Sequence, residues 1–356
     1  MPARITYNAL ALRPGGTGVQ TYIRELLAAM AQFAGPEGTD LTAVVQSDAV
    51  AELPAGVRAQ AKPVAAGLRR AVAGLRSLGP TDLVHGLDVD LPLRPGAPAV
   101  ATVHDMTPFD VPWTMSKRKA FGERRLYRYT LRRADAIIAD SAFTAERIEA
   151  ILGQSSTVVH LGTPSDLQPA EAEHIIDVRR RYELPDVFVL HVGTLEPRKD
   201  VATVAAACVQ AGVPLVLAGR VPAGSELPSG ARALGYVDRA DLPALYGAST
   251  ATAVPSRYEG FGLPPLEAMV CGAPVIAARV SALPEVLGDA AAFAAPGDVD
   301  DWTSVVRAVA ADHDRQSEMR DLGRKRAAKL TWRAAAEGTA AVYRTLGIDV
   351  GGSGTV

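Results

Sequence analysis

The stretch Pro255–Pro274 carries two glutamates on either side of a glycine-containing turn and a double proline. An apolar run before it predicts a strand, and prolines suit the first turn of the helix that would follow. Such a helix presents free backbone N–H groups to an anion, and Gly260 and Gly262 let the backbone approach a ligand closely. Glu259 could then face a sugar while Glu267 reaches a ribose. The structural alternative is an ordinary strand, loop and helix with two solvated glutamates.

A cationic pair, Arg198 and Lys199, follows a predicted strand over Phe188–Val192 after a short turn. Two positive charges at the carboxyl end of a strand suit a diphosphate, whose negative charge grows as a sugar leaves it. Adjacent basic residues are also common as surface charge that contributes little. The pair is a candidate for diphosphate binding if the fold places it in a ligand site.

Two further candidates follow predicted strands in the N-terminal half. Gly15 and Gly16 lie between the first strand and a helix, like a dinucleotide-binding turn without the right spacing. Close packing of a strand on a helix also needs glycine. His104 and Asp105 follow the apolar run Ala99–Val103, where a histidine could hydrogen-bond a transferred sugar or stabilise developing charge. A structural histidine–aspartate pair that braces the loop is the alternative.

The elements that must position these residues alternate along the chain. Apolar runs of strand length are separated by amphipathic stretches of helical length, which favours parallel sheets covered by helices. The predicted strands are 4–9, 42–46, 83–85, 99–103, 188–193, 214–218, 233–235, 252–255 and 274–277. The predicted helices are 19–33, 120–133, 142–152, 201–210, 264–271 and 300–311. The expected fold class is α/β, with two doubly wound halves that bind a ligand at the carboxyl ends of their strands.

A cluster of glycine, proline and polar residues at His160–Pro169 predicts the linker between the halves. The predicted domains are residues 1–168 and 169–331, with a C-terminal helix at 332–347 that returns to the first domain. Residues 348–356 are predicted to form a disordered tail.

With these elements in place, Pro255–Pro274 resembles the signature of family 4 retaining glycosyltransferases, in which two glutamates are separated by seven residues. That family has the GT-B fold, in which two Rossmann-like domains face each other across a cleft. The resemblance implies that Glu259 and nearby backbone amides hold the donor sugar, while Glu267 binds the ribose hydroxyls. Those amides belong to Gly260, Phe261, Gly262 and Leu263.

The resemblance extends to the cationic pair and to the N-terminal loop. It implies that Arg198 and Lys199 grip the donor diphosphate, and the matching segment includes Thr194. It also implies that Gly15 and Gly16 lie near the donor phosphates and the acceptor.

Weaker similarities complete the expected site. The family's histidine–aspartate pair corresponds to His104 and Asp105, which implies a catalytic role for both. Tyr236 and Val237 would line the pocket for the donor base, and Trp332 would lie near the start of the returning helix.

The resemblance implies a hexosyltransferase that moves a hexosyl unit from a nucleoside diphosphate sugar to a hydroxyl of a glycan, a glycolipid or a small molecule. The resemblance also implies a retaining transfer. No enzymic nucleophile is evident, so a front-face route through an oxocarbenium-like transition state fits better than a covalent intermediate. GDP-mannose is the first donor to consider, and UDP-hexoses come next. The same architecture also serves glycan phosphorylases, which need a lysine for pyridoxal phosphate. Nucleotide-sugar epimerases and non-catalytic sugar-nucleotide-binding homologues share it as well.

The composition argues against several other classes. A formal charge of -2 gives no reason to expect nucleic acid as a partner. Aspartates and histidines lack metal-ligand spacing, so we expect a metal-independent reaction with no cofactor. Cys208 and Cys271 suit buried thiols in a reducing compartment. We find neither a secretory signal nor a run of about twenty apolar residues, so a cytoplasmic location is expected.

The stretch Lys117–Arg133 holds eight basic residues and one acidic residue, interleaved with aromatic and leucine side chains. On a helix this pattern could contact an anionic membrane and reach a lipid-linked acceptor. Peripheral attachment at the inner face of the membrane is therefore one of two interpretations of this stretch. A solvated basic face over a buried apolar stripe is the alternative.

Overall fold

The computed structural model describes residues 3–15, 18–74, 76, 78–222, 224 and 226–351. The chain forms two compact units. The first unit comprises residues 1–162 and 331–356, and the second comprises residues 163–330. The predicted division after residue 168 therefore falls inside the second unit, in a segment without helix or strand.

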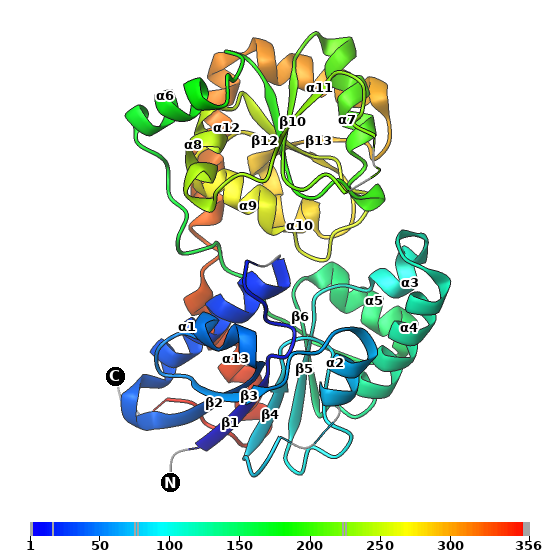
Figure 1. Ribbon diagram of the computed structural model, residues 1–356, viewed down its shortest axis with the longest axis vertical. Helices are drawn as coiled ribbons and strands as arrows, with labels where there is room; N and C mark the ends of the chain where they lie inside the picture. The colour runs from blue at the N-terminus through cyan, green and yellow to red at the C-terminus, as the bar shows by residue number, and fades with distance from the viewer. Residues whose placement is uncertain are drawn as a thin grey trace. The chain divides into compact units, whose positions relative to one another are not determined.

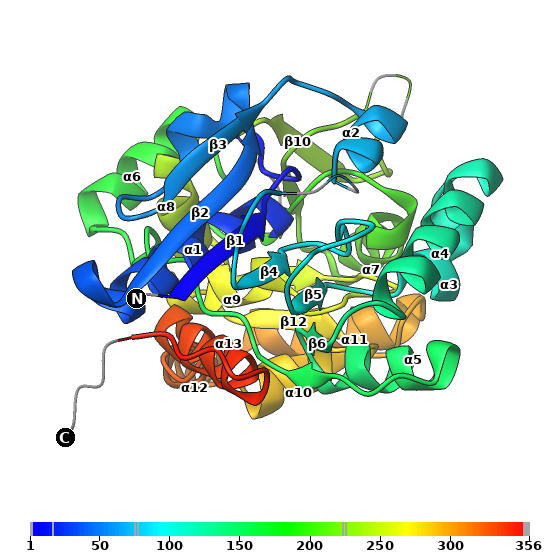
Figure 2. The same cartoon turned by 90° about the horizontal axis from the view of Figure 1, so that it is seen from below.

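The first unit is built on a parallel sheet of seven strands in the order β3-β2-β1-β4-β5-β6-β7 (Figures 1 and 2). Its strands are β1 (Ala3–Asn8), β2 (Thr39–Gln46), β3 (Arg58–Lys62), β4 (Leu83–Gly86), β5 (Ala99–Val103), β6 (Ala136–Ala139) and β7 (Thr157–Val158). Its α-helices are α1 (Gly18–Gly38), α2 (Gly67–Gly74), α3 (Thr107–Asp110), α4 (Lys117–Leu131), α5 (Ala142–Leu152) and α13 (Trp332–Thr345). The described part of this unit also contains the 3-10 helices η1 (Ser47–Glu52) and η2 (Pro112–Thr114).

The second unit has a parallel sheet of six strands in the order β10-β9-β8-β11-β12-β13. Its strands are β8 (Val189–Val192), β9 (Leu215–Ala218), β10 (Ala231–Gly235), β11 (Ala251–Val254), β12 (Val275–Ala278) and β13 (Ala291–Ala294). Its α-helices are α6 (Ala172–Arg181), α7 (Val201–Ala211), α8 (Leu242–Ala248), α9 (Leu263–Val270), α10 (Leu283–Leu287), α11 (Val299–Ala311) and α12 (His313–Ala327). The 3-10 helices are η3 (Pro197–Lys199), η4 (Arg239–Asp241) and η5 (Gly288–Ala290).

Helices cover both faces of each sheet because alternate strand residues point to opposite sides. In β5, Ala101 and Val103 join the core formed with Tyr127 of α4, whereas Thr102 faces α1 and hydrogen-bonds Tyr22. In the second unit, α7 and α11 pack on one face, with Trp302 buried there, and α8, α9 and α12 lie on the other (Figure 1). Two doubly wound parallel sheets are thus confirmed.

Capping residues set several helix boundaries. The Ser141 hydroxyl accepts a hydrogen bond from the backbone N–H of Thr144 at the start of α5, and Gly153 ends that helix in the left-handed conformation. Thr331 caps α13 in the same way as Ser141 caps α5. Helix α13 belongs to the first unit and packs against α1, which confirms the predicted return of the C-terminal helix.

The chain end differs from the predicted disordered tail. The side chain of Val350 is buried, and the backbone N–H of Gly351 donates a 3.4 Å hydrogen bond to Oγ1 of Thr39. Burial of this valine orders residues 348–351, and residues 352–356 lie outside the described part of the chain. Among the described residues, no helix combines the length and the apolar character needed to cross a lipid bilayer.

Candidate functional site

The strand order of the second unit reverses between β8 and β11, which are neighbours in the sheet. At such a switch point the connections leave toward opposite faces, so a crevice opens outside the carboxyl ends of the two strands. Arg198 and Lys199 follow β8, and Glu259 follows β11. The topology therefore brings three of the predicted site residues to one place.

Glu259 is the centre of this cluster, and only 8% of its surface is exposed. Lys199 Nζ lies 2.6 Å from Oε1 of Glu259, and Arg198 Nη1 lies 3.1 Å from Oε2. The Ser256 hydroxyl donates a further hydrogen bond of 2.7 Å to Oε1. Burial alone would raise the pKa of Glu259, but the charges of Lys199 and Arg198 and the donated hydrogen bonds lower it to about 2. The glutamate is thus a permanent carboxylate near neutral pH.

Backbone contacts fix the two loops against each other. Arg198 Nη1 donates a 2.6 Å hydrogen bond to the carbonyl oxygen of Tyr258, and the N–H of Arg257 donates a 2.8 Å bond to the carbonyl of Arg198. Arg257 also forms an ion pair of 2.6 Å with Asp200. The cationic pair is therefore part of an interlocked site rather than solvated surface charge.

The segment after Glu259 turns sharply into α9. Gly262 has a φ of 102°, and a Cβ atom there would lie 2.8 Å from Cδ2 of Leu283. The turn therefore requires glycine for both its conformation and its packing. Prolines occupy the early positions of α9 and have no N–H group. The backbone N–H groups before Pro264 are those of Gly260, Phe261, Gly262 and Leu263, the residues that the sequence predicts to bind the donor.

Glu267 lies on α9, in a second charged group of this unit. Its carboxylate lies 3.5 Å from Nη1 of Arg239 and accepts a 3.4 Å hydrogen bond from the Tyr246 hydroxyl. Burial raises the pKa of Glu267, and the charge of Arg239 opposes part of that rise. Arg239 also pairs with Asp166 through contacts of 2.5 and 2.8 Å. Glu267 is therefore held by neighbours rather than solvated.

Three predicted donor-binding residues lie around the ends of β8 and β10. Thr194 is half-buried in the turn after β8, where a Cβ atom on Gly219 would lie 2.1 Å from the carbonyl oxygen of Gly193. Tyr236 and Val237 follow β10 and differ in exposure: Val237 is buried, whereas 81% of Tyr236 is exposed. Of the two, only Tyr236 presents its side chain to solvent.

His104 lies in the first unit, at the end of β5. Its Nδ1 lies 2.7 Å from Oδ2 of Asp140, its Nε2 lies 3.0 Å from the carbonyl oxygen of Leu87, and the Tyr22 ring packs against it. Burial works to lower the pKa of His104, but the Asp140 carboxylate outweighs it and the pKa is raised to about 9. Since both ring nitrogens face acceptor oxygens, His104 is an imidazolium that donates from both.

Asp105 is not the partner of that histidine. Its Oδ1 accepts a 2.7 Å hydrogen bond from the backbone N–H of Thr107 at the start of α3. The structural alternative, in which His104 pairs with Asp105 to brace the loop, is therefore not what the structure shows, because consecutive residues leave a strand in different directions. Gly15 has a φ of 65°, in the left-handed region, and Gly16 lies outside the described residues.

Several residues of these clusters were missed by the sequence interpretation. Ser256 lies three residues before Glu259 in the same loop. A serine so close to the glutamate is a signal in the sequence for a hydrogen-bond donor to its carboxylate. Arg239 and Asp140 offer no such signal, because their partners lie far along the chain. Within the described part of the chain, no group of three or more His, Cys, Asp or Glu side chains is placed to hold a metal ion.

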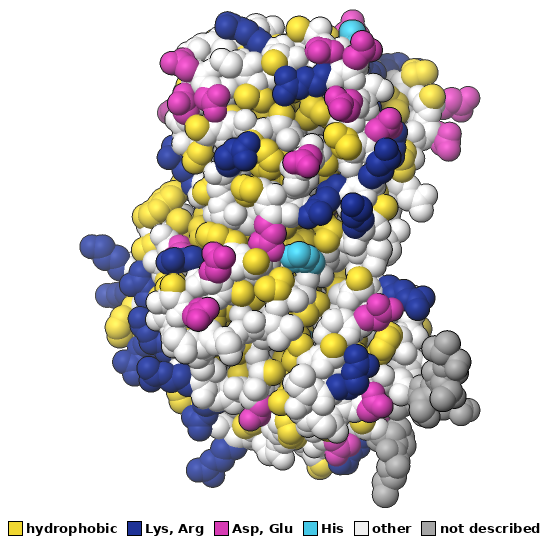
Figure 3. Space-filling view, turned by 180° about the vertical axis from the view of Figure 1, so that it is seen from behind, with side chains coloured by type: hydrophobic (Ala, Val, Ile, Leu, Met, Phe, Trp, Pro, Cys, Tyr) yellow, Lys and Arg dark blue, Asp and Glu magenta, His cyan; other side chains and the backbone are white. Residues whose placement is uncertain are grey.

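A basic, aromatic surface covers the exposed side of α4 in the first unit. Figure 3 shows Lys and Arg side chains gathered along one edge of this unit. Phe121 is 64% exposed and Trp113 is 58% exposed, so large apolar groups lie among the charges. The guanidinium of Arg125 lies 5.7 Å from the Phe121 ring centroid.

Two family models match the chain. "Glycosyltransferase Family 4" matches residues 16–167, and "Glycosyl transferases group 1" matches residues 177–326. The O-antigen chain mannosyltransferase B of Escherichia coli is 35% identical over 240 residues, which cover 61% of this chain and 62% of that protein. The match thus spans less than two thirds of that relative's length.

Two solved structures share the fold over nearly their whole length. Sucrose-phosphate synthase from Thermosynechococcus elongatus has a TM-score of 0.75 at 21% identity, covering 97% of this chain and 99% of that one. The Anabaena protein Alr3699/HepE, solved in complex with UDP and glucose, has a TM-score of 0.74 at 17% identity and covers 96% of this chain and 100% of that one.

Proposed function

The chain belongs to the family 4 glycosyltransferases and has the GT-B fold, and we propose that it is a hexosyltransferase with a nucleoside diphosphate sugar as donor. The E. coli relative named a mannosyltransferase supports the hexosyl class. The observation that carries the proposal is the buried cluster of Arg198, Lys199 and Glu259 at the switch point of the second unit.

Arg198 and Lys199 bind the donor diphosphate in this proposal. An ammonium group has three donors and a guanidinium has five, so each can hold Glu259 and a phosphate oxygen together. In this proposal the loop before α9, at the N-terminal end of that helix, also contributes to binding the diphosphate. Because the charge on the diphosphate grows as the sugar leaves, these groups bind the transition state more strongly than the ground state.

Glu259 positions the donor sugar and does not transfer protons. With a pKa of about 2 it stays ionised throughout the physiological range, so it accepts hydrogen bonds from sugar hydroxyls. Glu267 binds the ribose hydroxyls, and Tyr236, which is 81% exposed, stacks on the base. Thr194, in the turn after β8, contacts the donor phosphates in this proposal, and the role of Gly15 and Gly16 stays a prediction.

The proposed reaction retains the configuration of the sugar. The acceptor hydroxyl oxygen bonds to the anomeric carbon on the face from which the diphosphate departs, as the bond between that carbon and the phosphate oxygen breaks. The hydroxyl proton passes to the departing phosphate oxygen. No metal or cofactor takes part. His104 supports the reaction as a fixed positive charge, because both of its ring nitrogens are already donors.

GDP-mannose is the proposed donor, and the mannosyltransferase relative supports this choice. UDP-hexoses come second, in line with the UDP and glucose bound to the Anabaena structure. A thermal-shift screen with GDP, UDP, ADP and TDP and their sugars separates these donors, because a ligand stabilises the fold according to its affinity. The products formed from the donor that binds are then analysed. An isomerised nucleotide sugar would indicate an epimerase, and a donor that binds but is not turned over would indicate a non-catalytic homologue.

Alanine variants of Lys199 and Glu267 test the donor site. We expect Lys199→Ala to lower donor turnover by about 100-fold or more, and Glu267→Ala to weaken nucleotide binding, both measured with the donor found in the screen. Lys325→Ala, an exposed lysine on α12, is the matched control and should behave like the wild type. Near-normal turnover in Lys199→Ala would contradict the site assignment.

The exposed surface of α4 is proposed to contact an anionic membrane and to bring the enzyme to a lipid-linked acceptor. Its cations complement acidic headgroups, and Phe121 of α4 and Trp113 of the preceding η2 can enter the interfacial layer. Flotation with vesicles of phosphatidylglycerol and phosphatidylcholine should recover the wild type at low salt. A variant with Arg118 and Arg125 changed to Gln should be recovered with the vesicles in a smaller fraction. The control Lys325→Gln should be recovered in the same fraction as the wild type. Flotation equal to that with phosphatidylcholine alone would refute the contact.

A further inference from the structure

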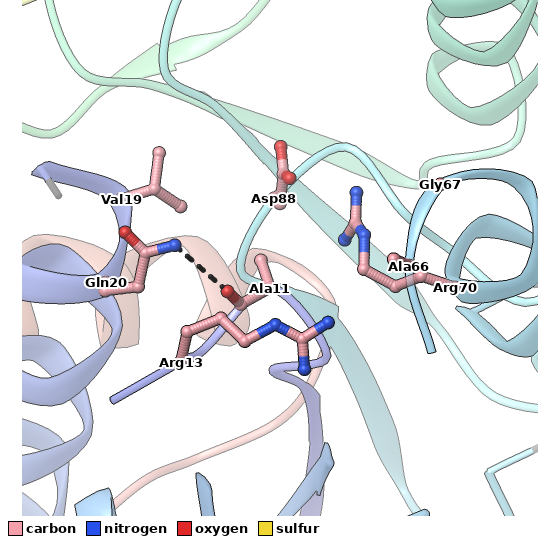
Figure 4. A pocket seen from close by; sticks show the side chains of 8 residues that line it. All are labelled: Ala11, Arg13, Val19, Gln20, Ala66, Gly67, Arg70 and Asp88. Atoms are coloured by element: carbon pink, nitrogen blue, oxygen red, sulfur yellow. Dashed lines mark hydrogen bonds between the residues drawn. The ribbon is translucent and has the colours of Figure 1, made fainter. Parts of the chain in front are cut away.

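We propose that a hollow in the first unit is an acceptor subsite for a sugar that carries an oxyanion, either a phosphate or a carboxylate. The hollow has a volume of about 330 Å³ and is lined by Arg13, Gln20, Arg70 and Asp88, among others (Figure 4). This volume lies at the lower end of the roughly 300–1,000 Å³ typical of small-molecule sites, which suits a single sugar with one charged substituent. The inference rests on the proposed glycosyltransferase function.

The hollow lies at the switch point of the first sheet. The strand order reverses between β1 and β4, and Asn8 pairs with Gly86 at the carboxyl ends of these strands. Arg13 follows β1, and Asp88 follows β4. The backbone N–H of Leu87 donates a 3.1 Å hydrogen bond to the carbonyl of Asn8, which holds the two strand ends together. The position is therefore the one where a doubly wound sheet opens a ligand crevice.

Two guanidinium groups reach this hollow from different elements. In Figure 4, the side chains of Arg13 and Arg70 extend toward each other from opposite sides. Arg13 Nη2 donates a 2.5 Å hydrogen bond to the carbonyl oxygen of Ala65, and Arg70 Nη1 forms a 2.9 Å ion pair with the buried Asp90. These contacts orient each group while using few of its five donors. Two oriented guanidinium groups suit the paired oxygens of a phosphate or a carboxylate.

The remaining lining groups suit the hydroxyls of a sugar. Asp88 supplies a carboxylate, and the side-chain amide of Gln20 is held by a 3.1 Å hydrogen bond from Nε2 to the carbonyl oxygen of Ala11. Asp88 directly follows Leu87, whose carbonyl accepts from the His104 imidazolium. The hollow is therefore next to the charged histidine that the sequence had singled out. The lining holds two cations and one carboxylate, and the cations are paired with Asp48 and Asp90, so the hollow would bind an oxyanion through oriented donors rather than through an excess of positive charge.

A second hollow of about 400 Å³ lies beside Lys62, Arg69 and Arg76. It too is basic, so it is the competing location for an anion. Arg69 and Arg70 are consecutive on α2 and line different hollows. Substituting them one at a time therefore distinguishes the two locations within the same helix.

Calorimetric titration of the full-length protein tests the inference with four probes: mannose 6-phosphate, glucuronate, mannose and inorganic phosphate. We expect mannose 6-phosphate or glucuronate to bind at least about tenfold more tightly than mannose, because charge-assisted hydrogen bonds add to the sugar contacts. The two charged sugars distinguish a phosphate-bearing from a carboxylate-bearing acceptor. Inorganic phosphate should bind more weakly than the better of them, since it lacks the hydroxyls.

Arg13→Gln should lower the affinity for the tighter-binding charged sugar by about tenfold or more. Arg69→Gln should leave that affinity unchanged. Arg70→Gln should act like Arg13→Gln, and Arg70→Lys preserves the charge beside Asp90 if the Gln variant fails to fold. Equal affinity for mannose and both charged sugars would overturn the proposal. No measurable binding, or a loss confined to Arg69→Gln, would overturn it as well.

Nucleotide titrations of the same variants separate this inference from the proposed function. Arg13→Gln should bind GDP and UDP like the wild type if the nucleotide is held in the second unit. Loss of sugar-phosphate binding with retained nucleotide binding supports the subsite. A wild type that binds the charged sugar but no nucleotide would refute the proposed donor while leaving the hollow as a binding site.

Discussion

The Lys199 ammonium lies 2.6 Å from Oε1 of Glu259, although 60 positions separate the two residues along the chain. The contact exists because Lys199 follows β8, Glu259 follows β11, and these strands are neighbours at the reversal of the sheet order. The cation that we propose for the diphosphate is thus also the ion-pair partner of a buried carboxylate. The pair keeps both charges in place at a buried position, where an unpaired charge would be costly.

Acid should weaken the fold through Glu259. Its pKa is lowered from 4.5 to about 2, so the folded protein binds this proton less readily than the unfolded chain. The resulting stability is fully present above pH 4.5 and is lost as the pH falls through about 2. The shift corresponds to on the order of 3 kcal/mol. Urea unfolding between pH 3 and 7 should therefore show the wild-type advantage over Glu259→Gln shrinking toward low pH.

Glu318→Gln provides the control for that experiment, because Glu318 is exposed on α12. Its unfolding free energy should follow the wild type at every pH. A wild-type advantage over Glu259→Gln that stays constant from pH 7 to pH 3 would mean that Glu259 is not paired in the folded protein.

The residues of this site could be predicted from the sequence, but the contacts between them could not. Arg198, Lys199 and Glu259 were recognisable because residue type and spacing along one segment are local properties. Their mutual pairing depends on which strands are neighbours, and no local pattern states that β8 lies next to β11. Arg239 illustrates the same limit, since its partners Asp166 and Glu267 come from two distant segments.

His104 shows why adjacency in sequence misleads at a strand end. In the sequence, Asp105 stood out as a structural partner of His104 only as the alternative to a catalytic role, and it is the neighbour in the chain. In the sheet, however, Val103 of β5 is in register with Ala139 of β6, so the residues that follow them, His104 and Asp140, meet across the two strands. Strand register, which follows from the assembled sheet, determines the partner.

The same pair predicts an alkaline loss of stability. The pKa of His104 is raised from 6.5 to about 9, so its contribution is fully present below pH 6.5 and is lost as the pH rises through about 9. The Cε1 proton of His104 should accordingly titrate near pH 9 by NMR. A midpoint near 6.5 for His104 would show that the Asp140 pair does not hold the proton.

Gly262 should tolerate no side chain. Its φ of 102° is unfavourable for alanine, and the added Cβ would lie 2.8 Å from Cδ2 of Leu283. Backbone strain and overpacking together predict that Gly262→Ala destabilises the protein by about 2–4 kcal/mol. The loop amides before α9 would also shift, so nucleotide affinity should fall with stability.

The opposite result is expected for Gly122, which lies within α4, where an added Cβ would meet no neighbouring atom within 4 Å. Gly122→Ala removes backbone freedom from the unfolded chain at a helical position, so it should stabilise the protein by about 0.5–1 kcal/mol. Urea unfolding of both variants, with calorimetric titration of the donor nucleotide, measures the two effects. Wild-type stability and affinity in Gly262→Ala would mean that the turn into α9 is not constrained as the structure has it. Gly122→Ala should leave nucleotide affinity unchanged, because α4 lies in the first unit and the proposed donor residues Arg198, Lys199, Glu259 and Glu267 lie in the second.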